Sequence, residues 1–193
     1  EGIATGCTLS NISLIGGETA EMPDIYKPGD FDLAGFAVGA LNRGNTLPKG
    51  ISSGDVIIGI RSSGLHSNGF SLVRLIVKNL GISLQSIAPF SDKKLGIELL
   101  KPTKIYVRPV LDLKKKGLIK GAAHITGGGL TANIPRILSE GQGAKINLDN
   151  LIIPEVFNWL FKESKINQQE ALKTFNCGTG MVLVVNNNKV NDV

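Results

Sequence analysis

The stretch GLHSNGFSLVR, residues 64–74, is the centre from which the rest of the chain can be interpreted. It follows an apolar run, VIIGI at 56–60, that predicts a buried strand. Apolar residues at helical spacing then predict a helix over 70–80. Backbone N–H groups at a helix start, with Ser67 and Asn68 as candidate caps, favour an anion such as phosphate. An ordinary capped turn has the same pattern, so this stretch alone leaves both interpretations open.

The composition is that of a globular protein suited to anionic ligands. Of the 193 residues, 42% are hydrophobic and 19% are charged, as in ordinary soluble domains. The 24 glycines fall in clusters without a fixed period, which favours phosphate-type loops over a collagen-like repeat. The net charge of +5 suits an anionic ligand. Nucleic acid is not expected as a partner, because only 5% of residues are aromatic and the basic run at 114–116 lies at a predicted helix end.

The cysteines and the hydropathy favour a cytoplasmic location. Cys7 and Cys177 show neither metal-ligand spacing nor a disulfide framework, so a reducing cytosol is the default expectation. No stretch is long and apolar enough to span a bilayer, so no membrane association is expected. The chain starts without Met and stops without a closing element, and we expect it to be a piece of a longer protein.

The first part of the chain predicts too few elements to fold alone. Residues 1–11 have the pattern of a helix end. The segment 13–17 predicts a short buried strand, and the alternation over 31–41 predicts a long strand with small residues. The segment 42–54 is rich in Gly, Asn, Ser and Pro, which marks the best boundary in the chain. We therefore expect an incomplete domain over 1–50 and a fuller domain over 51–193.

Two carboxylates, Glu18 and Glu21, follow the first predicted strand at its carboxyl end. This is a place where side chains can hold a metal ion or act as a base toward a ligand. A solvated loop closed by Pro23 explains the same residues, and the sequence does not decide between the two.

Helices and strands alternate through the rest of the chain. Helices are predicted over 94–100, 108–117, 130–138, 154–161 and 168–175. Strands are predicted over 121–126, 144–148 and 181–185. Cys177 comes just before the last strand, and without an activating partner it is expected to be a buried thiol rather than a nucleophile.

A second segment, AHITGGG at 123–129, has the same order of features as the segment 64–74. A predicted strand again leads through a histidine and small polar residues into glycines and a helix. Three consecutive glycines are costly to order and are most easily explained where the backbone must approach a ligand closely. A tight turn is the alternative. His66 and His124 are the only histidines, and each adjoins such a turn, which gives both a functional as well as a structural interpretation.

Five ordered segments resemble one enzyme family across nearly the whole chain. They are GGETAEMP at 16–23, SGLHSNGFSLVR at 63–74, PTKIYV at 102–107, AHITGGG at 123–129 followed by NIPR at 133–136, and TFNCGTGM at 174–181. These segments are similar to signatures of the phosphoribosylformylglycinamidine cyclo-ligases, also called aminoimidazole ribonucleotide synthetases, of purine biosynthesis. One glycine motif would be weak evidence, whereas five in order are strong.

The resemblance implies a homodimeric enzyme of two αβ domains that uses ATP and Mg²⁺ near the domain interface. It implies an α+β fold for residues 51–193, with a mixed sheet packed by helices. Residues 1–50 would be the end of the N-terminal, ATP-binding domain. The residues that the family uses for ATP and metal would lie before Glu1, so no metal ligand is assigned from the sequence.

The family reaction closes the imidazole ring of formylglycinamidine ribonucleotide with ATP. It requires a clamp on the ribose phosphate and a proton shuttle at nitrogen. The resemblance, placed on the two turns, makes His66 and His124 candidate proton carriers or polar orienters, and Glu18 a candidate base or metal-linked carboxylate. The expected phosphate clamp consists of Ser67, Asn68, Gly69, Thr126, Gly127, Gly128 and Gly129.

Two other interpretations remain. One is another ATP-dependent enzyme of the same superfamily, of the thiamine-phosphate kinase or selenophosphate synthetase type. The segments at 16–23 and 174–181 argue against it. The other is a non-catalytic folding or dimerisation module. The assignment of roles rests on one geometric prediction, which is that the two histidine-bearing turns meet in space.

Overall fold

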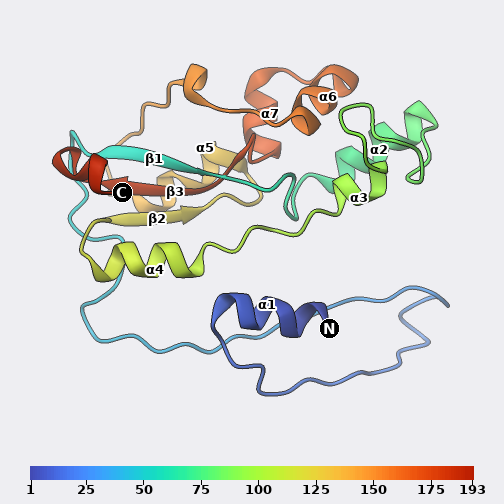
Figure 1. Ribbon diagram of the computed structural model, residues 1–193, viewed down its shortest axis with the longest axis horizontal. Helices are drawn as coiled ribbons and strands as arrows, with labels where there is room; N and C mark the ends of the chain where they lie inside the picture. The colour runs from blue at the N-terminus through green and yellow to red at the C-terminus, as the bar shows by residue number, and fades with distance from the viewer. The chain divides into compact units, whose positions relative to one another are not determined.

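The computed structural model describes all residues, 1–193, and shows two units (Figure 1). The first unit is Glu1–Thr46 and the second is Leu47–Val193. None of the helices combines the length and the apolar character that crossing a bilayer requires.

The first unit contains one helix and no strand. Helix α1 spans Gly2–Ser10, as predicted, and ends at Asn11, whose backbone is left-handed. The strands predicted over 13–17 and 31–41 are wrong. Both segments are irregular and exposed, and Ile15 and Phe36 are 93% and 96% exposed. An alternating pattern gives a strand only where another strand accepts its backbone hydrogen bonds, and the 1–46 unit offers none.

The second unit is built on a three-stranded antiparallel sheet, which confirms the α+β class. The strands are β1 (Val56–Arg61), β2 (Gly121–His124) and β3 (Thr179–Val185), in the order β1-β3-β2. Because β1 and β2 are each antiparallel to β3, they run in the same direction. Their carboxyl ends therefore lie at the same end of the sheet, as Figure 1 shows. The strand predicted over 144–148 is wrong, because this segment pairs with no strand.

The predicted helices are confirmed with small shifts at their ends. They are α2 (Phe70–Leu80), α3 (Leu95–Leu99), α4 (Val107–Lys115), α5 (Gly129–Asn133), α6 (Glu155–Ser164) and α7 (Gln168–Thr174), with short 3-10 turns at Pro135–Ile137, Leu148–Asn150 and Asn187–Asp192. Helix α2 ends at Gly81, whose left-handed backbone closes it as the sequence indicates. Pro135 interrupts the predicted 130–138 helix because it begins a separate 3-10 turn.

The two faces of the sheet pack against different helices. Alternate residues of β3 point to opposite faces, so Leu183 and Val185 meet the side of α4 while Val182 and Val184 meet α5 and the turn after it. A third cluster joins α2, α3 and α6 beyond the end of the sheet through Val73, Ile76, Leu95, Phe157 and Leu160. The sheet end where β1 and β2 finish is thus held between packed helices.

An ion pair joins the residue before β1 to the residue before β2. Lys120 Nζ lies 2.7 Å from Asp55 Oδ1, and the Asp55 side chain is only 6% exposed. Burial would raise the pKa of this carboxyl, but the hydrogen bonds from Lys120 and Ser52 together lower it below its ordinary 3.8. Its contribution to stability is therefore present above that value and is lost as the pH falls below it.

We expect Lys120→Met to lower the free energy of unfolding by about 2 kcal/mol, because it leaves the Asp55 carboxylate buried without its cation. Urea unfolding at neutral pH measures the effect. Lys115→Met removes a charge from the exposed side of α4 and should change stability by less than about 0.5 kcal/mol. Equal losses in the two variants would contradict the role of the pair.

Candidate functional site

The first turn, residues 62–69, connects β1 to α2. Neither Ser67 nor Asn68 caps the helix, contrary to prediction. The residue before α2 is Gly69, whose φ of 79° is left-handed, and no side chain caps the helix start. A Cβ at Gly69 would lie 2.7 Å from Phe175 Cδ1, so the buried ring leaves no space for a side chain. The Ser67 hydroxyl lies 3.3 Å from the Thr103 hydroxyl, within hydrogen-bond distance.

The first turn presents backbone donors that the protein leaves unused. The N–H groups of Ser67, Asn68 and Gly69 donate to no acceptor of the chain. The carbonyl of Gly69 accepts the Val73 N–H at 3.1 Å, which starts α2. Free N–H groups at the start of a helix of this length attract an anion.

The second turn, residues 125–128, connects β2 to α5 and has the same polarity. Gly128 has φ 90° and Gly129, the first residue of α5, has φ 58°. The N–H groups of Gly127 and Gly128 donate to no acceptor of the chain, whereas the Gly129 N–H donates to the Thr126 carbonyl at 3.0 Å. Thr126 is half-buried, and its hydroxyl donates to Asn133 Oδ1 at 3.3 Å.

The structure brings the two turns together. The rings of His66 and His124 have centroids 6.3 Å apart. A Cβ at Gly127 would lie 3.4 Å from Asn68 Oδ1, so these two residues of the turns are close neighbours. The predicted members His66, Ser67, Asn68, Gly69, His124, Thr126, Gly127, Gly128 and Gly129 all belong to these two turns or to their flanking residues.

His66 is held in a neutral, oriented state. It is 5% exposed, and its Nε2 accepts the N–H groups of Ser63 at 3.1 Å and Lys104 at 3.4 Å. Its proton is therefore on Nδ1, which is buried and has no partner in the chain. Burial first, then the charges of His124 and Lys104, lowers its pKa to about 4. Of the two predicted roles, this geometry supports the polar orienter rather than the proton carrier.

His124 differs from His66 in its access to solvent. It is the last residue of β2, its side chain is exposed, and its ring nitrogens make no hydrogen bond within the chain. Both nitrogens can therefore meet a ligand.

Tyr106, which the sequence analysis did not select, completes the cluster. Its ring centroid lies 6.2 Å from that of His66 and 6.0 Å from that of His124. Its hydroxyl donates to the carbonyl of Arg61 at 2.9 Å, and burial raises its pKa to about 12. Lys104 Nζ lies 5.8 Å from the Tyr106 ring centroid, which places a cation beside the histidines.

Gly180 of β3 packs directly against His66 and Tyr106. A Cβ there would lie 2.6 Å from His66 Cε1 and would collide with the Tyr106 hydroxyl. A glycine within a strand often marks a place where another group approaches the backbone closely. The glycine at position 180 could therefore have indicated this part of the site from the sequence.

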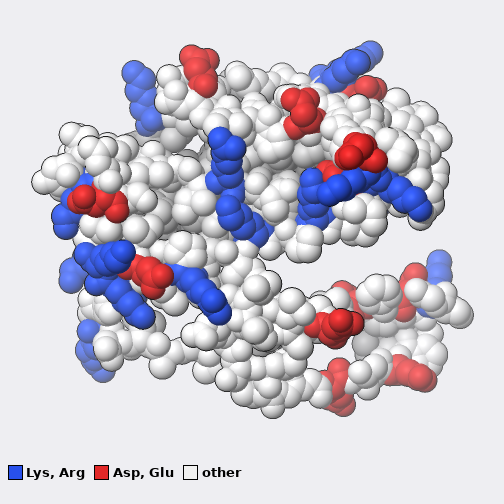
Figure 2. All heavy atoms as spheres, viewed as in Figure 1, with Lys and Arg blue, Asp and Glu red and all other residues white.

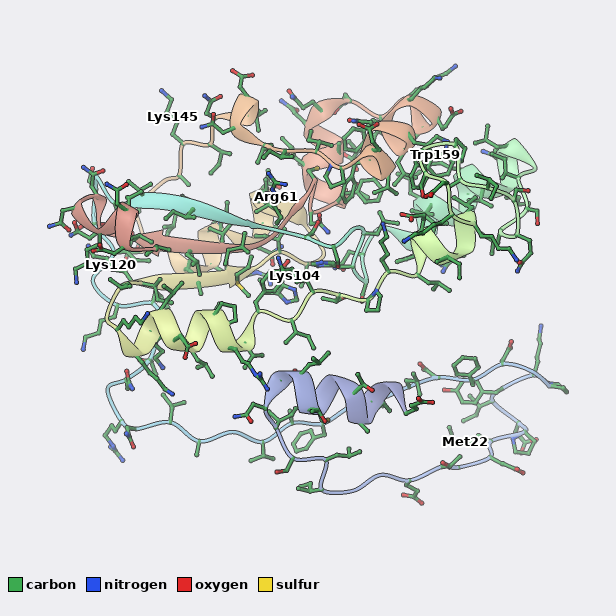
Figure 3. The ribbon with its side chains drawn as sticks, viewed as in Figure 1. Met22, Arg61, Lys104, Lys120, Lys145 and Trp159 are labelled. Atoms are coloured by element: carbon green, nitrogen blue, oxygen red, sulfur yellow. The ribbon has the colours of Figure 1, made fainter.

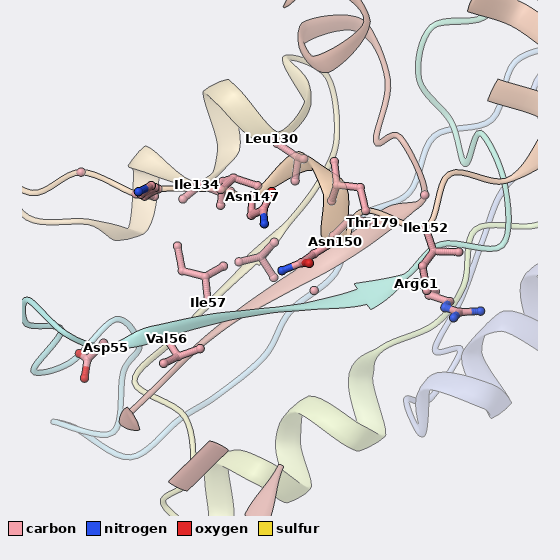
Figure 4. Close-up of a pocket in the computed structure, with 18 residues that line it drawn as sticks. Asp55, Val56, Ile57, Arg61, Leu130, Ile134, Asn147, Asn150, Ile152 and Thr179 are labelled. Atoms are coloured by element: carbon pink, nitrogen blue, oxygen red, sulfur yellow. The ribbon is translucent and has the colours of Figure 1, made fainter. Parts of the chain in front are cut away.

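A cleft of about 510 Å³ lies on the α5 face of the sheet. Figure 4 shows it along β1, with Asp55 near one end and Arg61 near the other. Ile57 and Val182 line its floor, while Lys145, Asn147, Asn150 and Ile152 come from the segment that follows α5. Arg61 connects the cleft to the first turn, and Figure 3 shows Arg61 and Lys104 near the same end of the sheet.

Positive charge also gathers away from this site. Figure 2 shows Lys and Arg side chains grouped where α4 ends, and Lys114 and Lys115 belong to its last turn. This position suits the helix dipole, as predicted, and lies at the opposite end of α4 from Tyr106.

Glu18 lies in the first unit, on the exposed segment after α1, and makes no hydrogen bond or ion pair. Its predicted role as a base or metal-linked carboxylate stays a prediction. No three side chains of His, Cys, Asp or Glu are grouped closely enough to hold a metal ion. Cys177 is buried, and burial raises its pKa to about 12, as expected of an unreactive thiol.

One comparison with known proteins bears on this geometry. The model of the family described as AIR synthase related protein, C-terminal domain, matches residues 52–193. The match covers the sheet, both turns and all the helices from α2 to α7.

Proposed function

The chain belongs to the AIR synthase related family through its C-terminal domain, a family of ATP-using enzymes, and on this premise we propose a specific reaction. The protein takes part in ATP-dependent ring closure of formylglycinamidine ribonucleotide to aminoimidazole ribonucleotide, with release of ADP and phosphate. The enzyme is cytoplasmic and acts as a homodimer.

The observation that carries the proposal is the meeting of two turns with unused backbone donors. The N–H groups of Ser67, Asn68, Gly127 and Gly128 donate to no group of the protein, and both turns lie at one end of the sheet. Such donors are arranged for a phosphate group. Lys104 adds positive charge beside the histidines, which favours a phosphorylated substrate.

The reaction then assigns roles to the surrounding side chains. The two turns hold the ribose phosphate, which fixes the substrate relative to the cluster. His124 exchanges the proton of the amidine nitrogen as it attacks the activated formyl carbon, because its ring is accessible. His66 stays neutral and keeps the segment before α4 in place through Lys104 N–H. Glu18 is proposed as a base or metal-linked carboxylate from the first unit.

Mg²⁺ accompanies ATP generally in this family, but the chain offers no complete set of ligands for it. Beyond the candidate carboxylate of Glu18, no residue is assigned to the metal ion. ATP is the source of the phosphoryl group that activates the formamide oxygen, and the residues described here act on the other substrate.

We expect His124→Asn to lower kcat by roughly 10²-fold, because it removes the accessible proton carrier. The measurement is ADP and aminoimidazole ribonucleotide formation by the full-length protein. Arg74→Gln, on the exposed side of α2, is the control and should leave kcat unchanged.

Three outcomes would contradict this proposal in part or in whole. Wild-type activity in His124→Asn would remove the role of that residue. Consumption of ATP with thiamine phosphate or selenide, but not with formylglycinamidine ribonucleotide, would assign another reaction of the superfamily. A full-length protein that uses none of these substrates would support the non-catalytic alternative.

A further inference from the structure

Two buried asparagines outside the predicted site hold the carbonyl groups of the two turns. Asn176 Nδ2 donates to the carbonyls of Gly64 at 2.9 Å and Leu65 at 3.2 Å, across more than a hundred residues of sequence. Asn133 Nδ2 lies 2.8 Å from the Gly129 carbonyl and 3.2 Å from that of Gly127. The two asparagines are 3% and 2% exposed, so neither is placed to touch a ligand from solvent.

Each asparagine is fixed in one orientation by its own oxygen. Asn176 Oδ1 accepts the Gly178 N–H at 2.8 Å, and Asn133 Oδ1 accepts the Thr126 hydroxyl at 3.3 Å. The Nδ2 group of each must therefore point to the turn. A side chain that only accepts hydrogen bonds would face carbonyl oxygens there, so the position requires an amide.

This arrangement separates donors from acceptors in the turns. The asparagines bind carbonyl oxygens of each turn on its buried side, while the N–H groups of Asn68, Gly127 and Gly128 stay unpaired. In a trans peptide the N–H points away from the C=O of the same plane, so holding the Gly127 carbonyl inward turns the Gly128 N–H outward. Asn176 fixes the start of the first turn at residues 64–65, just before its free donors. Free glycine-rich turns would otherwise rotate their peptide planes at little cost.

We propose that Asn133 and Asn176 are positioning residues that orient the backbone of both turns toward one phosphate group of the substrate. The inference rests on the anion clamp of the proposed function, and it names two residues that act through the turns without touching the ligand. It predicts that losing either amide weakens phosphate binding even when the fold is kept.

The test is a titration of the isotope-labelled full-length protein with inorganic phosphate, followed by the amide NMR signals of Gly127, Gly128 and Asn68. In the wild type these signals should shift together. In Asn133→Ala and in Asn176→Ala the apparent Kd for phosphate should rise by about 10-fold or more, because the turns are no longer fixed and their carbonyl oxygens can face and repel the anion.

Asn167→Ala is the matched control, because Asn167 caps α7 through the Glu170 N–H at 2.9 Å and lies outside both turns. It should cost about 1 kcal/mol of stability and leave phosphate binding unchanged. Where an alanine variant fails to fold, Asn133→Ser and Asn176→Ser keep one donor and should show a smaller rise in Kd. Steady-state kinetics should show the rise in the substrate KM with a smaller change in kcat.

The outcomes separate this inference from the proposed reaction. Phosphate shifts that depend on both asparagines, in a protein that performs a different ATP-dependent reaction, would support the inference and remove the ring closure. Unchanged phosphate affinity in the folded asparagine variants, or wild-type signals of the two turns that do not respond to phosphate, would overturn the inference.

Discussion

Gly129→Ala is expected to lower the free energy of unfolding by about 4 kcal/mol or more, a large effect for the addition of one methyl group. The φ of Gly129 is 58°, a left-handed value that disfavours a side chain. A Cβ there would collide with the carbonyl oxygen of Leu172 and lie 2.9 Å from that of Phe175. Both contacts are backbone, so α5 and α7 would have to move apart.

The neighbouring glycine provides the control for this prediction. Gly127→Ala places its Cβ 3.4 Å from Asn68 Oδ1, an ordinary contact, and Gly127 has no positive φ. It should change stability by less than about 1 kcal/mol. Urea unfolding midpoints of the two variants test the difference, and equal midpoints would show that α5 and α7 do not need the glycine.

The local signals in the sequence predicted most of the second unit. Gly81 ends α2 and Pro135 interrupts the 130–138 helix because both act through their own backbone geometry, which needs no distant partner. The strands β1 and β3 were recognisable because their apolar runs are short and bounded by turn residues. Elements whose cause lies within a few residues are therefore predictable.

The wrong strand predictions concern segments whose structure depends on hydrogen bonding to a neighbouring strand. Residues 31–41 alternate as a strand does, yet no neighbour accepts their hydrogen bonds, and Phe31 is 82% exposed. Residues 144–148 instead supply Lys145 and Asn147 to the wall of the cleft. The hydrophobic pattern contains no information on whether a partner strand is present.

The candidate site was predictable only in part for the same reason. His66 follows β1 and His124 ends β2, and two strands antiparallel to a common third finish at the same end of the sheet, so the proximity of the histidines follows from topology. Tyr106 and Asn176 lie in the segments 102–107 and 174–181 that carry the family resemblance, but nothing in their local pattern assigned either a role. Asn176 acts on the Gly64 carbonyl from the far end of the chain, and only the folded structure places it there.

His66→Gln is expected to remove a large loss of stability at acid pH. The pKa of His66 is about 4 in the folded protein, below the 6.5 of an unperturbed histidine. The unfolded chain therefore binds a proton that the folded protein excludes, and stability falls as the pH drops from about 6.5 to about 4. The size of this effect is about 3 kcal/mol, and it does not grow further below the folded pKa.

Glutamine is the informative replacement because its Oε1 can accept the N–H groups of Ser63 and Lys104 as Nε2 does, without titrating. Urea unfolding at a series of pH values between 7 and 4 measures the difference between the variant and the wild type. His124→Gln is the control and should keep most of the acid loss, because burial, the largest cause of the lowered His66 pKa, is unchanged. If His66→Gln lost as much stability as the wild type over this range, the imidazole would have to be accessible and able to protonate in the folded state. His66 would then become a second proton carrier beside His124, and the distinction in role between the two histidines would be lost.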